Sequence, residues 1–140
     1  VEKEVNKNSD LLAEATGFEP LLFRPPYGSH NETADEIIAA RGMAIVQWNV
    51  DTLDWKTKDT AKTIETTVEG AEKYTEPIAL MHDIHDATID AAEQILSQLA
   101  DGGFIPVTVS ELTLNTGGVE AGHAYCTGTG IEQSGFNCKG

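Results

Sequence analysis

Residues 78–85 read Ile-Ala-Leu-Met-His-Asp-Ile-His, an apolar run that ends in a cluster of two histidines and an aspartate. The apolar part has the length of a buried strand, and neither glycine nor proline interrupts it. A helical repeat of apolar residues follows from Ile89 to Leu99 and stops at Gly102-Gly103. This stretch therefore predicts a strand, a polar loop and a helix in direct succession.

The same unit recurs on both sides of this stretch. Strands are expected at residues 21–23, 43–50, 78–81 and 104–109. Helices are expected at residues 1–15 and 59–75. Another helix is expected to begin at Thr33, which can form a capping box with Glu36, and a short helical turn is expected to begin at Ser110. Strands separated by single helices pair in parallel, so the sequence predicts an α/β fold. Four strands cannot close a barrel alone, and an open doubly wound sheet is the other possible form. No glycine-rich phosphate loop follows a strand, which weakens a nucleotide-binding interpretation.

Side chains capable of chemistry follow three of the predicted strands. The segments are Arg-Pro-Pro-Tyr-Gly at 24–28, Asp-Thr-Leu-Asp-Trp at 51–55 and His-Asp-Ile-His at 82–85. In a parallel α/β fold the C-terminal ends of the strands lie on one face, where active sites are built. We therefore expect an active site at this face.

Each segment alone also has a structural explanation. The first could be a stiff turn, since prolines fix φ and Gly28 permits a bend. Asp54 could cap a helix, with Trp55 in the core. His82 could be a hydrogen-bonded structural histidine, or it could bind a metal with His85, although no third ligand with matching spacing is evident.

Taken in order, the three segments resemble the third, fourth and fifth motifs of carbohydrate esterase family four, the polysaccharide deacetylases with the NodB homology domain. The resemblance spans residues 21–112 and includes a closing strand and turn at 107–112. It implies a distorted (β/α) barrel of fewer than eight strands. It also implies hydrolysis of N-acetyl or O-acetyl groups on a polysaccharide such as chitin oligomers, peptidoglycan or acetylxylan.

The resemblance assigns catalytic roles to four residues. His82 is the acid that protonates the leaving amine, and Asp54 is its partner. A carboxylate beside His82 would favour the protonated imidazolium that such an acid needs. Arg24 orients the catalytic base, and the Tyr27 N–H helps to hold the oxyanion. Substrate binding falls to the remaining residues of the same segments, Pro25, Pro26, Trp55 and Leu80.

Two motifs of the family have no counterpart in this sequence. They are Thr-Phe-Asp-Asp-Gly and His-x-x-x-Ser-His, which carry the general base and the ligands of a divalent metal, zinc or cobalt. No residue of this chain is therefore expected to be a metal ligand, and the metal is expected to be held by residues outside it. We expect the chain to be the second half of the domain and to act with an N-terminal half on a second chain. A non-catalytic carbohydrate-binding or remnant domain is the alternative.

Charge and hydropathy limit the partners. The net charge of −14 and the isoelectric point near 4.4 disfavour nucleic-acid binding, because such a surface repels phosphate backbones. The same acidity also serves solubility alone. No apolar run approaches the roughly 20 residues that cross a bilayer.

The C-terminal part is expected to differ from the rest. We divide the chain into catalytic residues 1–113 and a Gly/Thr-rich extension, 114–140. A disulfide between Cys126 and Cys138 would stabilise this extension by about 3 kcal/mol. Disulfides form in oxidising compartments, which indicates a secreted or cell-wall protein. Two free thiols are the alternative.

Overall fold

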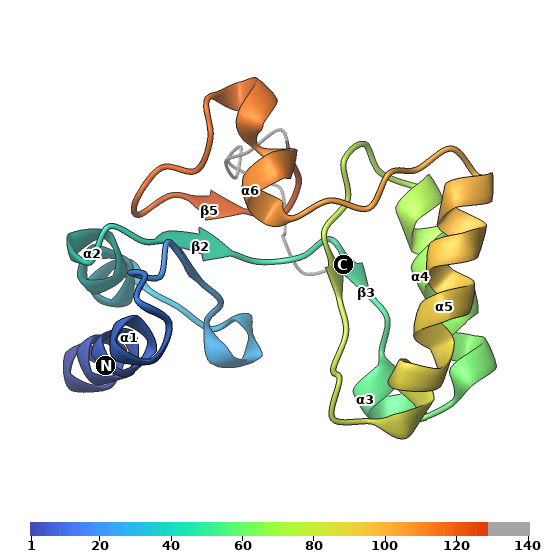
Figure 1. Ribbon diagram of the computed structural model, residues 1–140, viewed down its shortest axis with the longest axis horizontal. Coiled ribbons are helices and arrows are strands. Elements are labelled where there is room, and N and C mark those ends of the chain that lie inside the picture. The colour runs from blue at the N-terminus through green and yellow to red at the C-terminus, as the bar shows by residue number, and fades with distance from the viewer. Residues whose placement is uncertain (129–140) are drawn as a thin grey trace.

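The structure is a computed structural model that describes residues 1–128 (Figure 1). Helices and short parallel strands alternate along the chain, which confirms the α/β class. The strands form two sheets, one in the order β1-β2-β5 and the other of β3 and β4. Within these residues no strand pairing joins the two sheets, so closure into a barrel stays a prediction.

The first sheet is covered by two helices. β1 (Leu22–Phe23) pairs in parallel with β2 (Ala44–Val46), and the other edge of β2 pairs in parallel with β5 (Ala124–Tyr125). α1 (Glu2–Thr16) packs against α2 (Glu32–Ala40), and α2 lies against β2. Gly17 ends α1 in the left-handed conformation, with φ of 77°.

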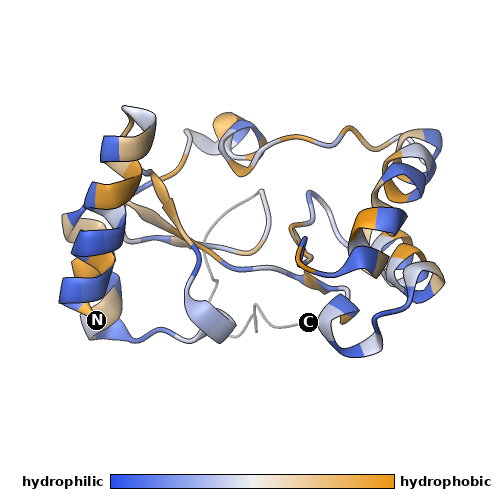
Figure 2. Cartoon of the chain, turned by 60° about the horizontal axis from the view of Figure 1, so that its bottom comes forward, coloured by the Kyte–Doolittle hydropathy of each residue, from blue (hydrophilic) through white to orange (hydrophobic). Residues whose placement is uncertain are grey.

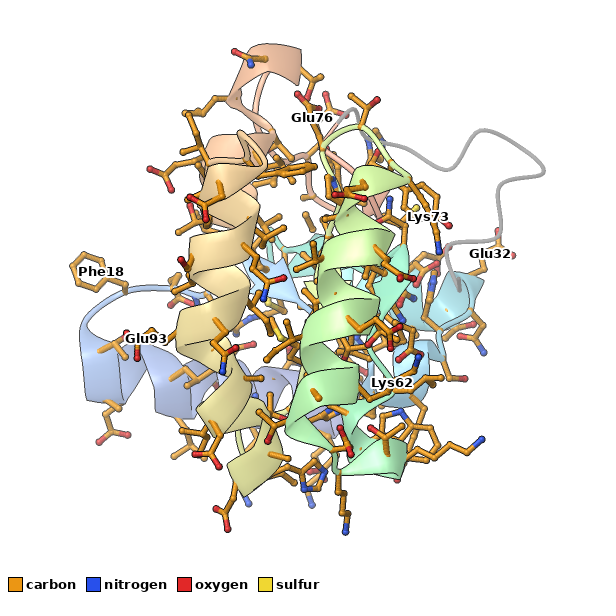
Figure 3. All side chains as sticks on the ribbon, turned by 90° about the vertical axis from the view of Figure 1, so that its right-hand side faces the viewer. Phe18, Glu32, Lys62, Lys73, Glu76 and Glu93 are labelled. Carbon is orange, nitrogen blue, oxygen red and sulfur yellow. The ribbon has the colours of Figure 1, made fainter. Side chains whose placement is uncertain are left out.

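The second sheet is covered by a helical hairpin. β3 (Val50–Asp51) pairs in parallel with β4 (Ala79–Leu80), and α4 (Thr60–Glu72) packs on β3 and on α5 (Asp86–Asp101). Figure 3 shows α4 and α5 side by side, with Lys62 and Glu93 projecting outward. Of the helices in residues 1–128, none is long and apolar enough to cross a membrane. Four short elements complete the fold: η1 (Pro26–Gly28), α3 (Asp54–Thr57), α6 (Val109–Leu112) and η2 (Leu114–Thr116).

Strand β2 is buried on both faces, as its unbroken apolar sequence indicates. One face packs Ala44 and Val46 against Tyr125. The other places Ile45 in a cluster with Ile38 of α2. Figure 2 shows the hydrophobic colour concentrated on the strands, while the helices carry both colours. A third apolar cluster lies between α4 and α5.

The predicted strand at 43–50 is wrong as a single element. It is divided into β2 and β3, which belong to different sheets. Between them the side chains of Gln47 and Asn49 add hydrogen bonds to other segments: Gln47 Nε2 donates to the Gly28 carbonyl at 2.9 Å, and Asn49 Oδ1 accepts from the Ile78 N–H at 2.9 Å. Two buried amides therefore redirect the chain where its hydropathy predicts a continuous strand.

The predicted strand at 104–109 is also wrong. Residues 104–107 have no regular structure, and Ile105 is 83% exposed. No strand of the described part pairs with this segment. Instead β5, which sequence reasoning missed, lies within the predicted extension at 114–140, and Tyr125 is only 3% exposed.

The helix starts match the sequence to different degrees. Asn31, and not Thr33, caps α2, because its Oδ1 accepts from the Ala34 N–H at 2.9 Å. A complete capping box is present instead at α6, between Thr108 and Glu111. Both residue types are good N-caps, so local sequence alone does not choose between positions two residues apart.

Replacing Gly70 by alanine is expected to destabilise the fold by about 1–2 kcal/mol. A Cβ at Gly70 would lie 2.4 Å from Cγ1 of Val50, a buried and stiff side chain of β3. The overpacking outweighs the gain of about 1 kcal/mol in helix propensity. Gly102→Ala is the control, because its Cβ would meet ordinary contacts of 3.4 Å or more. Urea unfolding measures both variants, and equal stabilities would contradict the close approach of α4 to β3.

Candidate active site

A cavity of about 780 Å³ opens where the predicted polar segments meet. Seven of the eight residues assigned from the sequence line this cavity. The eighth, Asp54, is buried and forms a hydrogen bond with His82 in the cavity wall. Two further wall residues, Trp48 and Asp51, were not among those assigned. The wall is formed by Arg24, Pro25, Pro26, Tyr27, Trp48, Asp51, Trp55, Leu80 and His82.

His82 and Asp54 form a hydrogen-bonded pair at this cavity. His82 Nδ1 lies 2.8 Å from Asp54 Oδ1. The Asp54 side chain is 1% exposed and the His82 side chain 35% exposed. With Nδ1 engaged by the carboxylate, Nε2 is the ring nitrogen left to face a ligand. The pair therefore has the arrangement of an exposed imidazole oriented by a buried carboxylate.

Asp54 accepts four hydrogen bonds, two at each carboxylate oxygen. Oδ1 accepts from His82 Nδ1 and from the Trp55 N–H at 2.8 Å. Oδ2 accepts from the His82 N–H at 2.6 Å and from the Thr88 hydroxyl at 2.8 Å. Burial of Asp54 opposes its ionisation, but these hydrogen bonds outweigh it and hold the pKa of the carboxyl below its usual value. Asp54 is therefore an anion at neutral pH.

A tight turn between β3 and α3 directs Asp54 into this position. Leu53 adopts the left-handed conformation with φ of 54°, and its N–H donates to Asp51 Oδ1 at 3.0 Å. The Thr52 hydroxyl donates to the Leu80 carbonyl at 2.7 Å, which ties the ends of β3 and β4 together. The Asp-x-x-Asp spacing thus uses its first carboxylate to shape the turn that places the second.

Arg24 is held by main-chain carbonyls. Its Nε donates to the Val46 carbonyl at 3.3 Å and its Nη2 to the Gln47 carbonyl at 3.4 Å. Its Cζ lies 5.8 Å from the centroid of the Trp48 ring, within cation–π range. Burial lowers the pKa of the guanidinium, although an arginine stays charged. Among residues 1–128 no carboxylate forms a salt bridge with it.

Tyr27 carries backbone strain at the rim of the cavity. Its φ is 58°, although it is a bulky residue that disfavours the left-handed region, and its side chain is 94% exposed. The prolines before it and the hydrogen bond from Gln47 to Gly28 hold this conformation. Strain of this kind is concentrated at functional sites.

The described residues do not fit a metal ion. Among residues 1–128 no group of three or more His, Cys, Asp or Glu side chains is arranged to hold one. The rings of His82 and His85 lie 6.2 Å apart between centroids, and His82 Nδ1 is already bonded to Asp54.

Sequence reasoning assigned no role to three residues of the site. Trp48 and Asp51 line the cavity, and Thr88 binds Asp54 from α5. Asp51 carries a signal, because it begins the segment at 51–55 and follows a strand. Trp48 and Thr88 carry none, because one lies within an apolar run and the other in a helical repeat.

Comparisons with known proteins place the chain in a family. The family model for polysaccharide deacetylases matches residues 1–46. The chain is 38% identical to the peptidoglycan-N-acetylmuramic acid deacetylase PdaC of Bacillus subtilis over 79% of its length. It is 36% identical to the peptidoglycan-N-acetylglucosamine deacetylase PgdA of Listeria monocytogenes over 80% of its length. It spans 22% and 23% of these two relatives, less than a quarter of each.

The fold is that of solved members of this family. A structure described as T48 deacetylase with substrate superposes with a TM-score of 0.80 at 39% identity, covering 89% of this chain and 59% of that one. A family 4 carbohydrate esterase from Streptomyces lividans, in complex with acetate, gives a TM-score of 0.72 at 31% identity. The superposition covers 86% of this chain and 59% of the esterase chain. The chain therefore belongs to carbohydrate esterase family four, the polysaccharide deacetylases with the NodB homology domain.

Proposed function

We propose that this chain supplies the acid-catalytic half of a metal-dependent polysaccharide deacetylase, which hydrolyses N-acetyl or O-acetyl groups. The observation that carries the proposal is the His82–Asp54 pair, a buried carboxylate bonded to the inner nitrogen of a histidine that lines the cavity. The family membership of the chain supports the same reaction.

The chemistry follows from the leaving group. An amide nitrogen leaves poorly unless it receives a proton as the C–N bond breaks. Asp54 accepts the hydrogen bond of His82 Nδ1, so Nε2 is the nitrogen that would deliver a proton to the departing nitrogen. The products are acetate and a free amine on the sugar. Loss of a general acid of this type lowers the rate by about 10²–10⁴-fold.

The other wall residues bind and orient the substrate in this proposal. Leu80 contacts the acetyl methyl, and Pro25 and Pro26 stiffen the opposite wall. The N–H of Tyr27, held by its unusual backbone, donates to the oxyanion.

Replacing Trp55 by alanine is expected to raise KM for the polymer about tenfold with little change in kcat. Its ring lines the cavity and is 49% exposed, so it is available to pack against a sugar ring. A loss of about 1.4 kcal/mol in binding corresponds to this factor. Steady-state kinetics on a soluble acetylated oligomer measure it. Trp55→Phe keeps an aromatic face and should recover most of the affinity, whereas an unchanged KM in Trp55→Ala would contradict the assignment.

The general base and the metal ligands belong, in this proposal, to residues outside this sequence. The family's first two motifs are not found in it, and the described residues offer no metal cluster. Two features fit an N-terminal half of the domain that lies outside this sequence. Arg24 has a charged head without a carboxylate among the described residues, and Ile105 is exposed beside an apolar cavity of about 530 Å³. A divalent ion, zinc or cobalt, would supply a Lewis acid there.

We further propose secretion or cell-wall association and a disulfide between Cys126 and Cys138. Cys126 is 2% exposed, next to β5, and Cys138 lies outside the described residues. The domain boundary at residue 113 is part of the same proposal, and so is the barrel that the N-terminal half would complete.

The test is acetate release from peptidoglycan, chitin oligomers and acetylxylan, with and without added zinc or cobalt. The purified protein is assayed together with any co-purifying chain, which mass spectrometry identifies. Metal-dependent acetate release from one polymer is expected, together with a partner that carries the Asp-Asp-Gly and paired-histidine motifs. Binding of a polymer with no acetate release under any of these conditions would support the alternative, a non-catalytic carbohydrate-binding domain.

A further inference from the structure

We propose that Thr88 is a positioning residue of this site, whose hydroxyl fixes the orientation of the Asp54 carboxylate that in turn orients His82. The proposal rests on the function proposed above for the mechanism, but its geometry stands independently. Thr88 belongs to the first turn of α5 and does not line the cavity, so it would act only through Asp54.

The hydrogen bond crosses between distant parts of the chain. Thr88 Oγ1 lies 2.8 Å from Asp54 Oδ2, and the two residues are 34 positions apart. Thr88 is 6% exposed and Asp54 0% exposed, so bulk water cannot replace the bond. Among the four donors to Asp54, Thr88 is the only one that comes from neither the histidine nor the adjacent residue. It therefore fixes the carboxylate from a third element, α5.

The other buried threonines of the helical hairpin behave differently. A threonine inside a helix ordinarily bonds the carbonyl four residues earlier in its own helix. Thr63 does so with the Asp59 carbonyl at 2.8 Å, and Thr67 with the Thr63 carbonyl at 2.6 Å. Thr88 lies in the first turn of α5, where no carbonyl of the same helix stands four residues earlier, and its hydroxyl donates to a carboxylate of another segment. Its hydrogen bond therefore reaches the site, whereas those of Thr63 and Thr67 stay within α4 and its N-cap.

Loss of the hydroxyl has a definite chemical consequence. Oδ2 would retain one donor, the His82 N–H, and the carboxylate would lose its one restraint from α5 while keeping the three donors on the His82 and Trp55 side. The hydrogen bond between Asp54 Oδ1 and His82 Nδ1 would lengthen, and the imidazole ring would be held less firmly. The other charged or titratable groups facing His82 are His85 and, across the cavity, Arg24, Tyr27 and Asp51, which the substitution leaves in place.

The test compares Thr88→Val, which has the same shape without the hydroxyl, with Thr88→Ser, which keeps the hydroxyl. The control is Thr67→Val, which removes a buried hydroxyl of the same hairpin that bonds only its own helix. In the full chain we expect the Hδ1 resonance of His82 to move upfield in Thr88→Val and to stay in place in Thr88→Ser and Thr67→Val. In the active protein, kcat for an N-acetylated oligomer should fall about tenfold in Thr88→Val with KM unchanged, and Thr88→Ser should restore it to within about threefold.

Two results would overturn the proposal: an unchanged His82 resonance in Thr88→Val, or an equal shift in Thr67→Val. Thr88→Ala, which also lacks the hydroxyl but adds no bulk, gives the same comparison if Thr88→Val does not fold. The resonance is read without turnover. A shifted resonance, with no acetate released when the chain is assayed together with its N-terminal half and metal, would therefore contradict the proposed function and leave the positioning role standing.

Discussion

Replacing His82 by alanine is expected to lower kcat for an N-acetylated glycan by about 10²–10⁴-fold. His82 is the cavity residue whose outer nitrogen is free to carry a proton while its inner nitrogen is held at 2.8 Å by Asp54. Without it the amine must leave unprotonated or take its proton from water. Acetate release at saturating substrate measures the loss.

The matched control is the neighbouring histidine. His85 lies on the same loop, with its ring centroid 6.2 Å from that of His82, but it is not part of the cavity wall. His85→Ala should retain activity to within a few fold. Near-normal turnover in His82→Ala, or an equal loss in His85→Ala, would contradict the assignment of the acid.

Replacing Asp54 by alanine is expected to impair both stability and catalysis. The substitution leaves four donors without their acceptor, and a buried donor left unpaired, such as the Thr88 hydroxyl, costs about 1–3 kcal/mol. Urea unfolding at neutral pH measures the difference from the parent chain. Asp83→Ala removes an exposed carboxylate from the same loop and should change stability by less than about 0.5 kcal/mol.

The same substitution has a pH signature. Because the pKa of Asp54 is lowered in the folded chain, its stabilising contribution is complete above the unfolded value of about 4. It is lost as the pH falls through the lowered folded value. The difference in unfolding free energy between the parent and Asp54→Ala should therefore narrow as the solution is acidified. A difference that does not depend on pH would contradict the buried anion.

The sequence predicts the helices and the site better than it predicts the strands. Helix α5 repeats apolar residues with a helical period and ends at a glycine pair, signals that are local. The polar segments after the strands converge on one cavity because parallel topology brings strand ends together. Such features need no knowledge of distant contacts.

The features that the sequence did not predict depend on contacts between residues far apart in the chain. The break in the strand at 43–50 results from amide hydrogen bonds of Gln47 and Asn49 to Gly28 and Ile78, which no local pattern contains. Strand β5 forms because β2 offers it an edge. The local sequence predicts Thr88 only as a helical residue, and its contact with Asp54, at 2.8 Å from the hydroxyl, is visible only in the structure.

The most direct test of the account compares two substrates that differ in their need for a leaving-group proton. His82→Ala is assayed on an N-acetylated glycan and on an activated aryl acetate, whose phenolate leaves without protonation. If His82 protonates the leaving amine, the variant loses about 10²–10⁴-fold on the amide and only a few fold on the ester. An equal loss on both substrates would show that His82 acts on something other than the leaving group, and would contradict the central claim.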